Sequence, residues 1–260
     1  MNSQRSAAAA AILCATLAAG DIRSRAAGDE AIAAPNTDVR AAMAPKAGAR
    51  LPVFVPPNRG APKTRVGGAT RGKQLPGTPS VAALVPEEGG LTVEAQPVLY
   101  WYLSESTTSR VDVTIVDEAS VTPLLETTIQ GPLAPGVHAI RLADHGVSLA
   151  PGINYQWFVA LVPDSEKRSN DVIAGGSIER VAPPEPLREQ LAAAAAEPAR
   201  SSVLAEAGIW YDALDAMSRA VEASPRNSEA RDTWAALLEQ VGLTEVARVE
   251  RDTAGVQGQR

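Results

Sequence analysis

Apolar residues between positions 80 and 181 occur in short runs that Pro- and Gly-containing turns separate. The runs are rich in β-branched and aromatic residues and follow one another every ~10 residues, a spacing that antiparallel hairpins close without helical crossovers. This pattern predicts an antiparallel β-sandwich over residues 81–182. About eight strands are expected, with the sequences VAALV, GLTV, VLYWYL, VDVTIV, LLETTI, HAIRL, YQWFVALV and SIERV.

The run over residues 110–116 has the clearest strand pattern. Val111, Val113 and Ile115 alternate with polar residues, so one face of this strand should be buried and the other exposed.

A later segment, LAPGINYQWFV over residues 149–159, resembles the tyrosine corner of fibronectin type III and immunoglobulin-like domains. In that feature a Tyr hydroxyl, here that of Tyr155, bonds to a nearby backbone group. The resemblance implies that Trp101 is the core tryptophan of the second strand of such a sandwich.

The pattern becomes helical over residues 185–247. Residues 187–196 are Ala-rich and should form a helix that Pro198 ends or kinks, because proline lacks an amide donor. The sequence Ala-Gly-Ile ending at Ile209 then recurs as Val-Gly-Leu ending at Leu243. This offset of 34 residues is the tetratricopeptide period. Residues 248–260 are expected to be a flexible tail.

Between the two copies, one helical stripe is apolar and contains Trp210. A proline at position 225 ends this helix, and Asn227 or Ser228 should cap the next one. So short a repeat cannot bury its apolar faces alone, because about three units are usually needed. The helical unit should therefore dock on the sandwich or on another protein, and Trp210 is a candidate contact residue.

The beginning of the chain has the features of a secretory signal over residues 1–25. Arg5 is the only charge before Asp21, and residues 7–19 form a short apolar run. Cys14, the single cysteine, lies in that run, but Leu13 stands where a lipid-attachment motif has a small residue. Signal cleavage is favoured over lipidation. An Ala/Pro-rich spacer over residues 26–50 should be disordered.

Positive charge is concentrated after this spacer. Residues 40–86 contain eight Lys/Arg and no acidic residue in a chain of formal charge −6. A basic Pro/Gly-rich arm is predicted over residues 51–80. Its candidate binding residues are Arg59, Lys63, Arg65 and Arg71, with Lys73 beside them.

Three interpretations of the arm remain open. It could be a solvated segment, because charge runs usually are. It could lie along the helical region, since residues 185–252 contain thirteen acidic residues against seven arginines. Alternatively, it could bind an anionic envelope surface or an acidic protein partner in a salt-sensitive way. Nucleic acid is disfavoured because the arm lacks interleaved aromatic residues after Phe54.

Catalysis has little support in the sequence. Asp144, His145 and Ser148 could be imagined as a hydrolase or metal-assisted site, and His138 is the only other histidine. Two histidines without a third ligand at motif spacing do not make a zinc site. The segment GGATRG lacks the Gly-Lys-Ser/Thr ending of a phosphate-binding loop. We expect no cofactor and no metal.

Taken in order, VPPNRGAPKTRVGGATRG, SIERV, GIWYDAL and WAALLEQVGL resemble the bacterial domain-of-unknown-function family 928 over residues 51–243. This family, common in cyanobacteria and some proteobacteria, is similar in being exported and carries no catalytic residues that could be transferred to numbered positions here.

The sequence thus predicts an α+β protein, with an antiparallel β-sandwich followed by a short C-terminal helical unit. We expect a non-catalytic, exported binding or adaptor module of the periplasm or extracellular space, with no integral membrane span. A hydrolase that uses Asp144 and His145 is the alternative.

Overall fold

A computed structural model describes residues 51–57, 65–70, 77–117, 119–120 and 122–257. The predicted signal, the spacer and four basic residues of the arm lie outside these ranges: Arg59, Lys63, Arg71 and Lys73.

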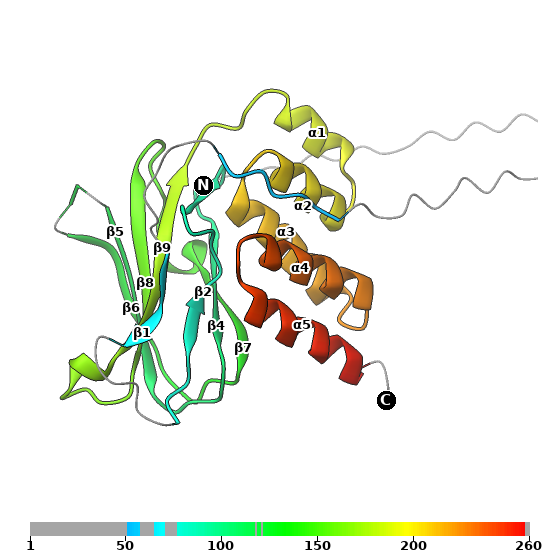
Figure 1. Cartoon of the computed structure of the whole chain (residues 1–260). Coiled ribbons are helices and arrows are strands. Elements are labelled where there is room, and N and C mark those ends of the chain that lie inside the picture. Colours follow the sequence, from blue (N-terminus) through cyan, green and yellow to red (C-terminus); the bar gives the residue numbers. More distant parts are fainter. Residues whose placement is uncertain (1–50, 58–64, 71–76, 118, 121, 258–260) are drawn as a thin grey trace, which may run out of the picture. The chain divides into compact units, whose positions relative to one another are not determined.

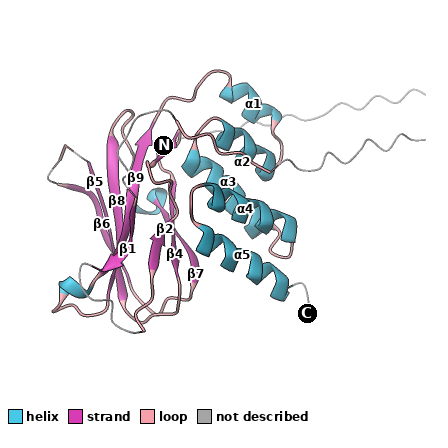
Figure 2. Ribbon diagram, viewed as in Figure 1, coloured by secondary structure: helices cyan, strands magenta, loops and turns pink. Residues whose placement is uncertain are grey.

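The strands of the described part form two sheets (Figures 1 and 2). The smaller sheet has the order β2 (Val81–Ala83), β4 (Val98–Leu103) and β7 (Gly136–Arg141). The larger has the order β1 (Val66–Thr70), β9 (Val172–Arg180), β8 (Asn154–Val162), β5 (Arg110–Asp117) and β6 (Pro123–Ile129). The α+β class is confirmed, and a fibronectin type III or immunoglobulin-like assignment stays a prediction.

Strand β9 has a divided outer edge. Antiparallel β1 pairs with its first half, and the short strand β3 (Gly90–Thr92) pairs in parallel with its last residues. Strand β1 was not expected, because its sequence VGGAT has little strand propensity. Its backbone forms a ladder with β9, so tertiary pairing outweighs the local preference.

Two details of the sandwich agree with the sequence pattern. On β5, Val111, Val113 and Ile115 are buried, as alternation predicts. The hydroxyl of Tyr155 on β8 accepts a hydrogen bond of 3.2 Å from the Ala150 amide, which is the kind of backbone contact that the predicted tyrosine corner requires.

Five helices follow in the described chain: α1 (Leu187–Ala193), α2 (Glu197–Glu206), α3 (Trp210–Ala223), α4 (Ser228–Gln240) and α5 (Thr244–Gln257). Helix α1 ends before Pro198, which lies in the first turn of α2, where a missing amide costs little. Asn227 caps α4 by accepting from the Ala230 amide. Helix α5 corrects the predicted boundary at residue 247, since it continues through most of the expected flexible tail.

The repeat of 34 residues is visible in the helical turns. Gly208 follows α2 with φ of 76°, and Gly242 follows α4 with φ of 77°. After each glycine, the next amide donates to a carbonyl five residues earlier, from Ile209 to Leu204 and from Leu243 to Leu238. The helices thus form two hairpins with matching turns, α2–α3 and α4–α5. The tetratricopeptide assignment itself stays a prediction.

Strand β4 is buried on both faces, which shows where the helices dock. Leu99, Trp101 and Leu103 are completely buried, and Tyr100 and Tyr102 on the opposite face are nearly so. The Tyr100 hydroxyl donates to Asp215 Oδ1 on α3 at 2.8 Å. The helical unit therefore covers the outer face of the smaller sheet (Figure 1).

Helix α3 also reaches the larger sheet. The Tyr211 hydroxyl donates to the Ser177 carbonyl oxygen on β9 at 2.9 Å and accepts from Trp157 Nε1 on β8 at 2.8 Å. Gly90 leaves room for this tyrosine, because a Cβ there would lie 2.7 Å from the Tyr211 ring. Of the two predicted docking partners for the helical unit, the sandwich is the one found.

Residues 51–57, hereafter the strap, run in extended form along the helical unit. The Phe54 amide donates to Gln240 Oε1 at 2.8 Å, and the Val55 amide donates to the Ala205 carbonyl oxygen at 3.1 Å. The Phe54 ring packs edge-on against Trp210. The first described part of the predicted arm is therefore bound to the body of the protein.

Candidate functional site

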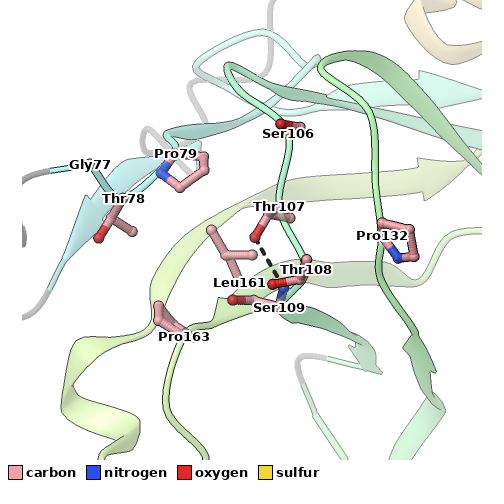
Figure 3. A pocket seen from close by; sticks show the side chains of 10 residues that line it. All are labelled: Gly77, Thr78, Pro79, Ser106, Thr107, Thr108, Ser109, Pro132, Leu161 and Pro163. Carbon is pink, nitrogen blue, oxygen red and sulfur yellow. Dashed lines mark hydrogen bonds between the residues drawn. The ribbon is translucent and has the colours of Figure 1, made fainter.

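One end of the sandwich carries a pocket of about 380 Å³, hereafter the loop-end pocket (Figure 3). Four segments contribute to it: the residues before β2, the β4–β5 loop, the β6–β7 loop and the end of β8 with the residue that follows. Its lining consists of Gly77, Thr78, Pro79, Ser106, Thr107, Thr108, Ser109, Pro132, Leu161 and Pro163.

Backbone pairing holds the two central loops of this pocket together. Thr107 and Leu133 exchange both amide-to-carbonyl hydrogen bonds, at 2.8 and 3.0 Å. Gly131 permits this approach, because a Cβ there would lie 2.6 Å from the Thr108 carbonyl oxygen. The Thr107 hydroxyl accepts from the Ser109 amide (Figure 3). The pocket wall is therefore ordered by bonds within the protein.

The chemistry of the loop-end pocket is polar and uncharged. Among the described residues that line it, none carries a charge, while five carry a hydroxyl. Figure 3 shows Thr107, Thr108 and Ser109 between Pro79 and Pro132. Hydroxyls both donate and accept hydrogen bonds, and proline rings offer apolar faces. This combination suits a neutral ligand that has many hydroxyl or amide groups.

No sequence pattern indicated this pocket. Its segments lie far apart along the chain, and no single one has a motif. The hydroxyl-rich stretch SESTTS over residues 104–109 was the available signal, but hydroxyl residues are equally common in ordinary turns.

A second pocket, of about 350 Å³, lies where the sandwich meets the helices and is hereafter the junction pocket. The chain between β3 and β4 lines one side, and α1, α2 and α3 line the other. Its ionisable side chains that carry a charge are Glu94, Arg200, Asp212, Asp215 and Arg219.

Asp212 is the most unusual group of the junction pocket. Its side chain is nearly buried, and burial is the main cause that raises its pKa from 3.8 to about 7. Glu94 raises the pKa further by repulsion, whereas hydrogen bonds from the Thr92 hydroxyl and the Val93 amide lower it. Its Oδ1 atom is buried and has no hydrogen-bond partner among the residues that the structure describes.

The two arginines of the junction pocket are already paired. Arg219 binds Asp215 on the same helix and Glu197 on α2, the latter at 3.2 Å. Arg200 lies 3.9 Å from Glu197. In the described part of the chain, the acidic groups of this pocket with no such ion pair are Asp212 and Glu94, so its remaining charge is negative.

Comparison with protein families supplies one match. The model of the family described as Domain of Unknown Function (DUF928) matches residues 66–251, which is more than half of the chain. The protein belongs to the DUF928 family. No curated protein matches the chain.

The DUF928 match corrects the extent of the resemblance inferred from the sequence. It begins at residue 66, at the start of β1, so the strap and the basic stretch up to and including Arg65 lie outside it. It continues to residue 251 within α5. The matched region therefore contains both sheets and both helical hairpins.

Among the basic residues predicted to make the arm bind, Arg65 is the one whose position in this DUF928 protein is described. Its guanidinium donates to the Val241 carbonyl oxygen at 2.8 Å and to the Val85 carbonyl oxygen at 3.1 Å, and it lies 3.4 Å from Glu87 Oε1. The side chain is 15% exposed. Arg65 thus connects the helical unit to the sandwich, and we do not carry its predicted binding role forward.

Trp210 is likewise internal. The side chain is fully buried, and its Nε1 donates to the Leu84 carbonyl oxygen at 2.9 Å. It has no surface to offer a partner in this fold, so its predicted contact role becomes a structural one.

The residues of the hydrolase alternative lie on the surface. Asp144 and His145 belong to a short 3-10 turn after β7, and they are exposed, as is Ser148. None of them lines the loop-end or the junction pocket. His138 lies on β7 instead, stacked on Trp101 at 4.6 Å. This placement gives the hydrolase interpretation no support.

Within the described ranges, no group of three or more His, Cys, Asp or Glu side chains is placed to hold a metal ion. No helix in those ranges has the length and apolar character needed to cross a bilayer.

Proposed function

We propose that this DUF928 protein is a non-catalytic, exported binding module of the cell envelope, and that the loop-end pocket is its ligand site. One observation carries the proposal: four separate segments build an open, hydroxyl-lined cavity at one end of a rigid sandwich, and its described lining residues carry no charge. Loops on a rigid scaffold are common places for binding sites, because they vary without disturbing the core.

A neutral glycan chain is the ligand class that fits this pocket. Sugar hydroxyls match the threonine and serine hydroxyls as both donors and acceptors, and the C–H faces of a sugar ring can pack on proline rings. The volume of about 380 Å³ falls within the usual range for ligand pockets. An acidic glycan would find no cationic partner among the described lining residues.

The hydrogen bonds between the loops favour tight ligand binding in the loop-end pocket. The paired Thr107 and Leu133 backbones and the close contact at Gly131 hold the β4–β5 and β6–β7 loops in place before a ligand arrives. A preordered site loses less conformational entropy on binding.

The test is calorimetric titration of the purified protein with cellotetraose, maltotetraose and chitotetraose, and with tetragalacturonic acid as the acidic probe. At least one neutral probe should bind, and the acidic one should not. Thr108→Val keeps the side-chain shape and removes one hydroxyl, so we expect affinity to fall about 3- to 10-fold, the value of one net hydrogen bond.

Thr122→Val is the matched control, because Thr122 is also exposed but lies in the β5–β6 loop outside the pocket. Absence of binding by every neutral probe would refute the assignment, as would equal affinities for wild type, Thr108→Val and Ser106→Ala.

Protein contact through the strap is a second candidate function, because the strap presents Leu51, Val53 and Val55 at 57%, 56% and 50% exposure. Hydrogen bonds on its other side hold these aliphatic groups in place. Arg59 and Lys63 follow within a few positions in the sequence. An acidic protein partner with apolar side chains would match both features.

Pull-down from envelope extract at low and high salt tests this second function. Leu51→Ser/Val53→Ser should lose the partner at all salt concentrations, whereas Arg59→Ser/Lys63→Ser/Arg71→Ser should lose it most at low salt. Leu124→Ser, at an aliphatic residue on β6 that is 37% exposed, is the control. Identical partner lists for wild type and the three variants would exclude the strap and the arm as protein-binding surfaces. Retention of the wild-type protein on anionic vesicles instead would assign the arm to a lipid surface.

Export to the periplasm or extracellular space is part of the proposal, since residues 1–25 have the pattern of a secretory signal. A fusion of residues 1–50 to alkaline phosphatase should be active outside the cytoplasm, and an inactive fusion would count against export.

A further inference from the structure

The junction pocket is a built site, separate from the loop-end pocket. Residues from the sandwich and from three helices meet there around a volume of about 350 Å³. It contains a buried carboxyl group that is not fully hydrogen-bonded. The Asp212 carboxyl is about nine-tenths buried, and its Oδ1 has no hydrogen-bond donor in the described part of the protein. A buried acceptor without a hydrogen-bond donor usually destabilises the folded state.

The charges around Asp212 indicate which kind of ligand the junction pocket favours. Glu94 lies at the exposed side of the same pocket, on the chain that follows β3. On the helical side, Asp215 is bound by Arg219, and both arginines of the pocket face Glu197. A positively charged group that donates hydrogen bonds would therefore offset the charge of the Asp212 carboxylate and the repulsion between Asp212 and Glu94.

We propose that the junction pocket binds a small ligand that carries a primary ammonium group, which pairs with the Asp212 carboxylate and faces Glu94. An ammonium suits the site better than a metal ion, because two carboxylates without a third ligand form an incomplete metal site. The volume accommodates a ligand of several non-hydrogen atoms beyond the ammonium.

Binding of a cation at this site requires the charged form of Asp212. Burial and Glu94 raise the Asp212 pKa to about 7, so the carboxyl is mostly ionised at pH 8 and mostly protonated at pH 6. The other charged groups around it are Glu94 on the sandwich side, Arg200 on α2, and Asp215 and Arg219 on α3. Linkage then predicts affinity about tenfold weaker at pH 6 than at pH 8.

The experiment is calorimetric titration of the full chain with three four-carbon probes at ~0.15 M salt, which screens weak surface attraction. The probes are 1,4-diaminobutane, 1,4-butanediol and succinate. We expect only the diamine to bind. Asp212→Asn, which keeps the shape of the side chain, should weaken binding at least ~10-fold and abolish its pH dependence, and Glu94→Gln should weaken it ~3-fold.

Asp144→Asn is the matched control, since it removes one exposed carboxylate far along the chain from this pocket and should leave binding unchanged. Circular dichroism checks that each variant is folded. Equal binding of the diamine to wild type and Asp212→Asn would overturn the proposal, as would no binding at millimolar concentrations. Preferential binding of succinate would assign the pocket to Arg200 and Arg219 instead.

Discussion

Replacing Trp210 with alanine tests the contact that joins the helical unit to the sandwich. The side chain is completely buried, its indole N–H donates to the Leu84 carbonyl oxygen just after β2, and its ring contacts Phe54 of the strap. Truncation of a large buried aromatic residue typically costs 3–5 kcal/mol, part of which is the cavity that remains. For a domain of this size we expect the melting temperature to fall by about 6–20 °C.

Urea denaturation followed by far-UV circular dichroism and by tryptophan fluorescence measures this loss. Because Trp210 and Tyr211 bind both sheets, the helices and the sandwich should unfold in one transition in the wild type. Leu124→Ala is the control, since this partly exposed side chain on β6 should cost less than ~1 kcal/mol. A cost below about 1 kcal/mol for Trp210→Ala, or separate wild-type transitions for the two signals, would refute the docking argument.

Three further predictions concern the stability of the sandwich and the helical unit packed on it. Gly208→Ala should destabilise the fold by about 1 kcal/mol more than Gly242→Ala when both are measured by urea denaturation. Both glycines have a positive φ, but only at Gly208 would an added Cβ meet the backbone, 2.9 Å from the Val55 carbonyl oxygen. Equal costs would mean that the strap is not held there. Tyr211→Phe should lower the free energy of unfolding by about 1–3 kcal/mol in the same measurement, since the buried Trp157 indole N–H loses its acceptor. An unchanged stability would contradict this hydrogen bond. Because the Asp212 pKa is raised, the folded state still holds this proton at pH values where the unfolded state has lost it. The bound proton therefore stabilises the fold fully below pH 4, and this stabilisation disappears as the pH rises to about 7. Wild type should therefore lose about 3 kcal/mol relative to Asp212→Asn between pH 5 and pH 8, and parallel pH profiles of the two proteins would contradict it.

Local patterns in the sequence were sufficient for several individual elements, though not for β1 or for the full length of α5. Alternation on β5 predicted its buried face, and the recurring Gly208 and Gly242 predicted two matching helical turns. These features depend on neighbours within a few positions, where strand and helix periods and glycine conformations act directly. The class of the fold and its order along the chain followed from them.

The boundaries that proved wrong depend on distant contacts. Strand β1 forms because an open edge of β9 is available, although its own sequence is rich in glycine. Arg65 has the composition of a binding arm, yet its guanidinium meets carbonyl oxygens of residues 85 and 241. Composition cannot distinguish an exposed arginine from one whose donors are used internally, because the acceptors come from elsewhere in the chain.

Both pockets belong to the tertiary structure for the same reason. The loop-end pocket joins residues between positions 77 and 163, and the junction pocket places Asp212 of α3 beside the chain that follows β3. By itself the sequence determined an α+β protein in which a sandwich precedes a helical unit. Only the tertiary structure, through the meeting of loops at one end of the sandwich and the packing of helices on the sheets, decided which polar groups face a cavity, because burial and hydrogen bonding depend on residues brought together from distant parts of the chain.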